Sequence, residues 1–160
     1  MNDMKQVEEM YREYYKKKNV KFFYANKRRS LYARLIDIVN TVPVKNVIDI
    51  GTGMGDLVEL LNANNIKAIG VDFPIVDIIE YHKKLKNNKL FVYGSISDED
   101  IVYRIRKLQN NEMNTMALII DTLRYIEDQA ITSFVESYKP TYLLIKEVSN
   151  TSYMRTRREL

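Results

Sequence analysis

The chain has 160 residues, 46% of them hydrophobic and 29% charged, which predicts one domain large enough to bury its own core. It contains no cysteine and one histidine, so disulfides, thiolate metal sites and zinc sites built from several histidines are excluded. No apolar run reaches the roughly 20 residues of a membrane span, and the charged first residues lack the apolar stretch of a signal peptide. We therefore expect a cytoplasmic protein that does not bind membranes.

The net charge of +4 is unevenly distributed along the chain. Residues 1–40 carry ten basic and five acidic side chains, whereas residues 41–160 carry fifteen and sixteen. Basic and aromatic residues are interleaved between Lys16 and Arg34, a composition that suits contacts with the phosphates and bases of a nucleic acid. At helical spacing the same aromatic residues also suit packing in a core. Nucleic acid is therefore a candidate partner of this segment.

The first 40 residues predict two amphipathic helices. Apolar residues recur at three- and four-residue spacing from Met4 to Tyr15, which places them on one helix face. A second helix is predicted over residues 27–40. Its expected inward residues are Leu31, Leu35, Ile38 and Val39.

From residue 45 onward, short β-branched segments alternate with longer helical ones. Strands are predicted at 46–50, 68–71, 90–93, 116–120 and 142–146, and helices near 56–64, 75–85, 98–108 and 128–137. This alternation is typical of an α/β fold with a mostly parallel sheet, and the nearly continuous apolar strands indicate helices on both faces. We expect a doubly wound sheet with the N-terminal helices packed on it, all in one domain.

The five glycines gather at the ends of three predicted strands. Gly51, Gly53 and Gly55 follow the first strand, Gly70 lies near the end of the second, and Gly94 follows the third. Glycine after a strand permits a positive φ or the close approach of a ligand to the backbone. Because ligands of open α/β sheets bind beyond the carboxyl ends of the strands, these glycines predict a ligand site at that edge.

The glycine spacing separates the candidate nucleotide cofactors. A dinucleotide fingerprint, G-x-G-x-x-G, would need a third glycine where the chain has Asp56, and a carboxylate there would repel a pyrophosphate. The Gly-Lys-Ser/Thr element of a P-loop is also missing. Asp72 ends the second strand, where a carboxylate can accept hydrogen bonds from both ribose hydroxyls. Asp49 precedes the turn and is placed to fix the loop or to face a positively charged ligand.

The pattern D-x-G-x-G-x-G from Asp49 to Gly55, followed by Gly70-Val71-Asp72, resembles motif I and the ribose-binding acid of class I S-adenosylmethionine (SAM)-dependent methyltransferases. The resemblance extends from about Val44 to Val148. It implies a Rossmann-like fold, SAM as cofactor and methyl transfer to an acceptor that the sequence does not identify. The cofactor-binding residues that it implies are Asp49, Gly51, Thr52, Gly53, Asp72, Phe73, Ser95, Ile96 and Asp121.

Several of these residues have a second interpretation. Phe73 either lies against the adenine or packs in the core. Ser95 stands where the family often has an Asp, so that contact is weaker or comes from Asp98, which we expect rather to cap the following helix. Asp121 either contacts the methionine amine or substrate, acts as a general base, or is an N-cap or surface carboxylate. Tyr125 is a candidate for flanking the transferred methyl group; the family has no universal catalytic residue.

The chain also departs from the family pattern. Asp121 is followed by Thr-Leu-Arg and not by a Pro-Pro-Tyr element, which argues against methylation of the amino groups of adenine or cytosine by the usual route. The absence of cysteine excludes covalent methylation of cytosine C5. Thirteen residues follow Glu147, which is too few for the usual C-terminal hairpin. We expect a trimmed sheet whose exposed edge is covered by the N-terminal helices or by a second subunit of a homo-oligomer.

Three functions remain open on these grounds. The first is an active SAM-dependent methyltransferase. The second is a non-catalytic SAM-binding or degenerate Rossmann module that acts as a subunit, and the third is nucleic-acid binding through the basic segment. The expected layout is a helical segment over 1–42, a SAM-binding core over 43–148 and a basic tail over 149–160. His82, in the sequence Tyr-His-Lys-Lys, is expected on the surface.

Overall fold

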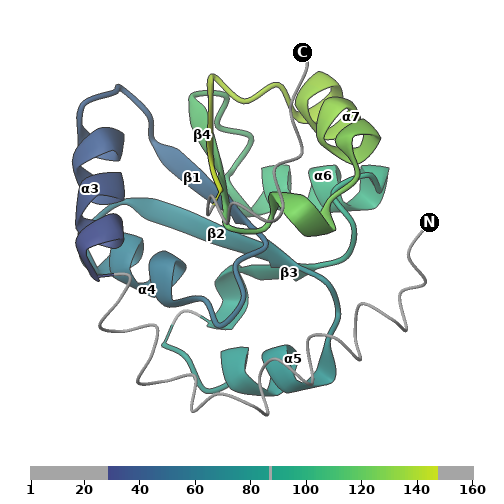
Figure 1. Cartoon of the computed structure of the whole chain (residues 1–160), viewed down its shortest axis with the longest axis horizontal. Coiled ribbons are helices and arrows are strands. Elements are labelled where there is room, and N and C mark those ends of the chain that lie inside the picture. Colours follow the sequence, from purple (N-terminus) through teal and green to yellow (C-terminus); the bar gives the residue numbers. More distant parts are fainter. Residues whose placement is uncertain (1–28, 87, 148–160) are drawn as a thin grey trace.

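The computed structural model describes residues 29–86 and 88–147 (Figure 1). The predicted helix between Met4 and Tyr15, most of the basic segment and the tail over 149–160 lie outside the described residues. The expectations of an absent C-terminal hairpin and of a covered sheet edge fall partly on the same residues and stay predictions.

Five strands form one parallel sheet in the order β3-β2-β1-β4-β5. The strands are β1 (Asn46–Ile50), β2 (Lys67–Asp72), β3 (Phe91–Tyr93), β4 (Thr115–Ile120) and β5 (Tyr142–Lys146). The order reverses at β1, which pairs with β2 on one side and with β4 on the other. In open α/β sheets the crevice at such a reversal is where ligands bind, so the topology places a site beyond the carboxyl ends of β1 and β4. The α/β class with a parallel sheet is confirmed.

Helices cover both faces of this sheet, as Figure 1 shows. Helices α3 (Arg29–Asn40) and α4 (Asp56–Ala63) lie on one side, and α6 (Glu99–Leu108) and α7 (Asp128–Tyr138) lie on the other. Helix α5 (Val76–His82) and the short 3-10 helix η1 (Asn88–Leu90) connect β2 to β3, and a second 3-10 helix, η2 (Leu123–Tyr125), follows β4. None of the described helices is long and apolar enough to cross a membrane.

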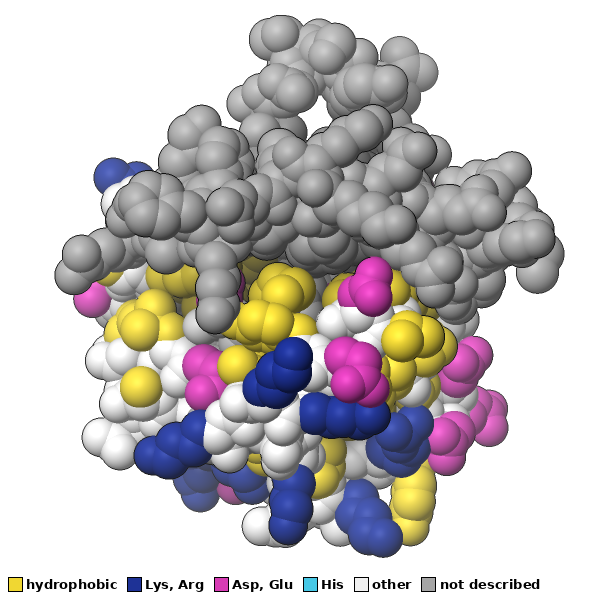
Figure 2. Space-filling view, turned by 90° about the horizontal axis from the view of Figure 1, so that it is seen from below, with side chains coloured by type: hydrophobic (Ala, Val, Ile, Leu, Met, Phe, Trp, Pro, Cys, Tyr) yellow, Lys and Arg dark blue, Asp and Glu magenta, His cyan; other side chains and the backbone are white. Residues whose placement is uncertain are grey.

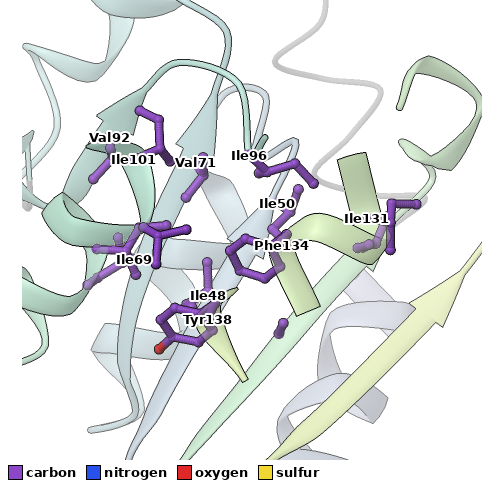
Figure 3. Close-up of a cluster of buried hydrophobic side chains, with 14 of the residues drawn as sticks. Ile48, Ile50, Ile69, Val71, Val92, Ile96, Ile101, Ile131, Phe134 and Tyr138 are labelled. Carbon is purple, nitrogen blue, oxygen red and sulfur yellow. The ribbon is translucent and has the colours of Figure 1, made fainter. Parts of the chain in front are cut away.

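Alternate strand residues divide the core between the two faces. On the face of α6 and α7, Ile48 and Ile50 of β1 pack with Phe134 of α7 (Figure 3). On the opposite face, Val47 packs with residues of α3 and α4. Because side chains alternate along a strand, Asp49 of β1 lies on the same face as Val47. Strand β1 thus places the acidic side chain of Asp49 on the face of the sheet that α3 and α4 cover.

Helix α3 packs on the sheet as the sequence predicts, with one correction. Leu35 and Val39 are buried against the core of this face, and Leu31 packs beside them. Ile38 was expected inward but is 40% exposed. The reason is that positions 31, 35 and 39 recur every four residues and already fill the stripe that faces the sheet, which leaves Ile38 on its flank.

Candidate functional site

The loop between β1 and α4 is shaped by three glycines with positive φ. Gly51, Gly53 and Gly55 have φ angles of 73°, 57° and 81°, a region that residues with a Cβ rarely adopt. Space is also restricted, because a Cβ on Gly51 would lie 2.7 Å from the Cβ of Thr122 and one on Gly55 would lie 2.6 Å from the ring of Phe91. The loop therefore requires glycine both for its backbone conformation and for its close packing. We call residues 51–55 the glycine loop.

Asp72 ends β2 directly beside this loop. Its Oδ2 accepts a hydrogen bond from the Gly53 amide at 2.6 Å, and its Oδ1 accepts one from the Phe73 amide at 2.8 Å. The side chain is buried, and burial raises the pKa of the carboxyl to about 7, although both hydrogen bonds act in the opposite direction. A carboxylate has about four lone-pair sites, so two backbone donors leave it capacity for further donors.

Asp49 adds a second carboxylate on the same face of the sheet. It is buried in β1, and its partner in the register with β2 is Gly70. The charge of Asp49 adds to the effect of burial in raising the pKa of Asp72. Gly70 leaves room between the strands and the loop, since a Cβ there would lie 2.6 Å from Phe91 and 2.8 Å from Thr52. The glycine loop therefore packs against strands that carry two buried carboxyl groups.

His82 is buried under the glycine loop, and its expected surface position is wrong. Its side chain is 0% exposed, its ring stacks on Phe91 with centroids 3.8 Å apart, and its Nε2 lies 2.9 Å from the carbonyl oxygen of Gly53. The other ring nitrogen, Nδ1, lies 3.0 Å from the hydroxyl of Tyr93. The available signal was the spacing of Ile78 and His82, because residues four apart share one helix face and Ile78 is also fully buried.

These contacts determine the protonation of the ring. A carbonyl oxygen only accepts hydrogen bonds, so Nε2 of His82 must donate to Gly53. In the neutral ring Nδ1 then accepts from the Tyr93 hydroxyl. Burial lowers the pKa of His82 to about 4, against the opposing effect of the bond to Gly53, so the imidazole is neutral at pH 7.

The residues that follow β3 differ in burial and in their contacts. Ile96 is buried in the hydrophobic cluster of Figure 3, whereas Ser95 is half-buried and its hydroxyl lies 2.7 Å from that of Ser97. Asp98 occupies the N-cap position of α6, but its carboxylate accepts from the Ser95 amide at 3.3 Å and makes no side-chain bond to the helix. Asp98 therefore occupies the expected N-cap position, but its side chain does not cap the helix.

Phe73 is half-buried beside Asp72 and is not part of the core.

The end of β4 is tied to the end of β5. Asp121 has a φ of 57°, and its Oδ1 lies 2.7 Å from Nζ of Lys146. The amide of Leu123 donates to Oε2 of Glu147 at 3.1 Å. Tyr125 lies in η2 and is half-buried. Lys146 and Glu147 were not predicted as site residues, although both lie at a strand end on the edge where the site was expected.

Thr122 links this second cluster to the glycine loop. Its hydroxyl lies 3.3 Å from the carbonyl oxygen of Gly51 and 2.9 Å from that of Ile120. The ends of β1, β2 and β4 therefore meet at the glycine loop. The acids Asp49 and Asp72 lie on one side of it, and the pair Asp121–Lys146 lies beyond Thr122 on the other.

Comparisons with known proteins give low-identity matches over most of the chain. No protein-family model matches it. The chain is 27% identical over 122 residues to the ribosomal RNA small subunit methyltransferase A of Streptococcus thermophilus and 29% identical over 119 residues to the probable polyketide synthase 22 of Dictyostelium discoideum. These alignments include 71% and 74% of the chain, but they span only 42% and 4% of the two relatives.

A solved structure matches the fold. The methyltransferase domain of bacterial-CtHen1-CN aligns with a TM-score of 0.56 at 16% sequence identity, over 84% of this chain and 74% of that one. The match includes the five-stranded parallel sheet with its covering helices. The chain thus has the class I, Rossmann-like fold of SAM-dependent methyltransferases.

Proposed function

We propose that this chain binds SAM at the carboxyl edge of β1, β2 and β4 and transfers its methyl group to an acceptor. The observation that carries the proposal is the buried carboxylate of Asp72 at the end of β2, held against a loop of three glycines with positive φ. This arrangement stands in a fold shared with a methyltransferase domain. The likeness of the fold and the chemistry of the residues at this edge support the proposed cofactor and reaction.

The residues at this edge fit SAM in three respects. Asp72 keeps acceptor capacity for the two ribose hydroxyls after binding Gly53 and Phe73. The interacting carboxyls of Asp72 and Asp49 suit a cationic ligand and oppose a pyrophosphate. The hydroxyl of Thr52 is buried without a hydrogen-bond partner in the part of the chain that the structure describes, and a polar ligand group would satisfy it.

The chemistry asked of the protein is mainly orientation. When bound, SAM supplies a methyl group that its sulfonium already activates. Asp72 would hold the ribose, and the glycine loop would follow the rest of the ligand at close range. Asp121 and Lys146 are placed on the other side of the loop, where the carboxylate can take a proton from an acceptor hydroxyl or amine and the ammonium can orient the acceptor.

RNA is the acceptor class that we would test first. One relative at 27% identity is a ribosomal RNA methyltransferase. The segment that follows α5 carries four exposed lysines, and phosphates are bound by such side chains: Lys83, Lys84, Lys86 and Lys89. Figure 2, seen from the side of α5 in Figure 1, shows several Lys and Arg side chains on this face, with Asp and Glu side chains among them.

Calorimetric titration with SAM tests the cofactor directly. Wild type should bind, and Asp72→Asn should weaken binding by about tenfold or more, because the amide accepts less strongly and has one oxygen in place of two. Glu136→Gln is the matched control, since it removes the same charge from an exposed position on α7. If the folded wild-type protein shows no heat of binding, the proposal is wrong.

Radiolabelled SAM then tests turnover. Incorporation of label into an RNA pool, with protein and DNA pools in parallel, would identify the acceptor class. Label in protein or DNA alone would refute RNA as acceptor. Binding of SAM without label in any pool would favour the non-catalytic module.

A further inference from the structure

Gly53 is held at both of its backbone polar groups by buried side chains from two other elements. Its amide donates to Asp72 Oδ2 at 2.6 Å, and its carbonyl accepts from His82 Nε2 at 2.9 Å. Asp72 comes from the end of β2 and His82 from the end of α5. Gly53 has a φ of 57°, so the glycine loop turns at the residue that makes both of these hydrogen bonds.

His82 is itself fixed in position by β3. Its ring stacks on Phe91 at 3.8 Å with an angle of 18° between the planes, and its Nδ1 meets the hydroxyl of Tyr93. Phe91 and Tyr93 are two residues apart on a strand and so lie on one face of β3. The same Phe91 ring fills the space that a Cβ would need at Gly55 and at Gly70. Strand β3 thereby fixes the position of the His82 ring and packs closely against the glycine loop.

The end of α5 places the His82 ring under the glycine loop. The amides of Lys84 and Leu85 donate to carbonyls three residues earlier, those of Tyr81 and His82, so the helix tightens directly after His82. Leu85 then lies beside the loop, with its Cδ1 3.2 Å from the place of a Cβ on Gly55. A lysine-rich surface segment thus begins at a buried histidine that contacts the candidate cofactor site.

We infer that His82 is a positioning residue for the cofactor: held by Tyr93 and Phe91, it fixes the Gly53 carbonyl and so keeps the Gly53 amide on the ribose-binding carboxylate of Asp72. This inference rests on the proposed function, since it assigns a role within the same site. His82 need not touch the ligand for this role. It acts by holding the glycine loop in the conformation that the ligand requires, so that less ordering is needed on binding.

Three variants separate this role from simple stability. His82→Phe keeps the stacked ring but removes both hydrogen bonds, whereas His82→Gln keeps an N–H donor for Gly53 and an acceptor for Tyr93. Phe134→Leu weakens the core on the opposite face of the sheet and serves as the matched control for lost stability. Titration with S-adenosylhomocysteine should show about tenfold weaker binding for His82→Phe, near wild-type binding for His82→Gln, and no change for Phe134→Leu.

Nuclear magnetic resonance tests the same inference without any ligand. In wild type, the His82 ring should carry its proton on Nε2 only, and the Gly53 amide should exchange slowly with solvent. In His82→Phe the protection of that amide should fall at least tenfold relative to amides of β1, and His82→Gln should restore it. A proton on Nδ1 in wild type, or unchanged protection of Gly53 in His82→Phe, would overturn the inference.

The two readouts distinguish failure of the inference from failure of the proposed function. If wild type does not bind S-adenosylhomocysteine or SAM, the proposed function fails, and with it the role of His82 toward a cofactor. If wild type binds and His82→Phe binds equally well, only the positioning role fails. Should His82→Phe not fold, the ring proton of wild type and the variant Tyr93→Phe, which should lower Gly53 protection while leaving His82 in place, still decide the matter.

Discussion

Replacing Asp72 by asparagine should change how the stability of the chain depends on pH. The pKa of Asp72 is raised from 3.8 to about 7 in the folded chain, so between these values the folded state holds a proton that the unfolded state has released. The contribution of Asp72 is therefore fully present below pH 3.8 and is lost as the pH rises through about 7. The difference between the two pKa values corresponds to about 4 kcal/mol.

His82 acts in the opposite direction over nearly the same range. Its pKa is lowered from 6.5 to about 4, so the unfolded state binds a proton that the folded state does not. Its contribution is present above pH 6.5 and is lost as the pH falls through about 4, by about 3 kcal/mol in total. In wild type the two contributions oppose each other. Among the groups that face them, the charge of Asp49 adds to the raised pKa of Asp72, and burial, followed by the charge of Asp72, raises the pKa of Tyr93.

Urea denaturation followed by far-ultraviolet circular dichroism measures this balance. As the pH is lowered from about 7 to about 4, wild type should gain about 3 kcal/mol relative to Asp72→Asn, because all other groups are common to both proteins. His82→Gln should show the opposite trend. Its free energy of unfolding should lie below that of wild type near pH 7, and this difference should shrink as the pH falls toward about 4. A difference between wild type and Asp72→Asn that stays constant over this range would refute the argument that burial raises the pKa of Asp72.

Three further predictions concern the same site. Binding of S-adenosylhomocysteine, measured by calorimetry, should weaken as the pH falls through about 7 and level off near the affinity of Asp72→Asn, because protonation removes the charge with which Asp72 accepts from the ribose hydroxyls; constant affinity would contradict this. Gly55→Ala should lower the free energy of unfolding by about 2 kcal/mol or more, owing to its φ of 81° and the contact with Phe91, whereas an unchanged urea midpoint would contradict the close packing of the loop. Lys146→Met should slow methyl transfer about tenfold or more while leaving cofactor affinity unchanged, and equal loss of both would place Lys146 at the cofactor.

The fold could be predicted because its signals are local. Short β-branched segments that alternate with helical ones predicted the strands, and the first and last of them, Asn46–Ile50 and Tyr142–Lys146, have the predicted bounds. The glycines after β1 and the acid at the end of β2 likewise predicted that these two strand ends would meet. These patterns arise from burial on both faces of a sheet and from backbone conformations that only glycine adopts readily, so they are visible in the sequence itself.

The partners of the site residues could not be predicted in the same way. The burial of His82 depends on Phe91 and Tyr93, which belong to another element, and a Tyr-His-Lys-Lys sequence gives no sign of that contact. Lys146 meets Asp121 only because β5 lies beside β4 in the sheet order. Helix α5 was predicted to reach residue 85, but it ends at His82, where bonds three residues apart replace those of the α-helix. Each of these features is set by tertiary packing.

The contacts around the glycine loop show how it is held in shape without a ligand. The amides of Gly51 and Thr52 donate to the carbonyl of Val71, the carbonyl of Gly51 accepts from Thr122, and Gly53 is bound by both Asp72 and His82. Elements from both sides of the sheet reversal thus fix one short loop. A loop ordered in advance loses little conformational entropy on binding, so a ligand that fits it should bind through a few well-placed polar groups. For the same reason, affinity should respond to residues such as His82 and Thr122 that hold the loop, even though neither needs to touch the ligand.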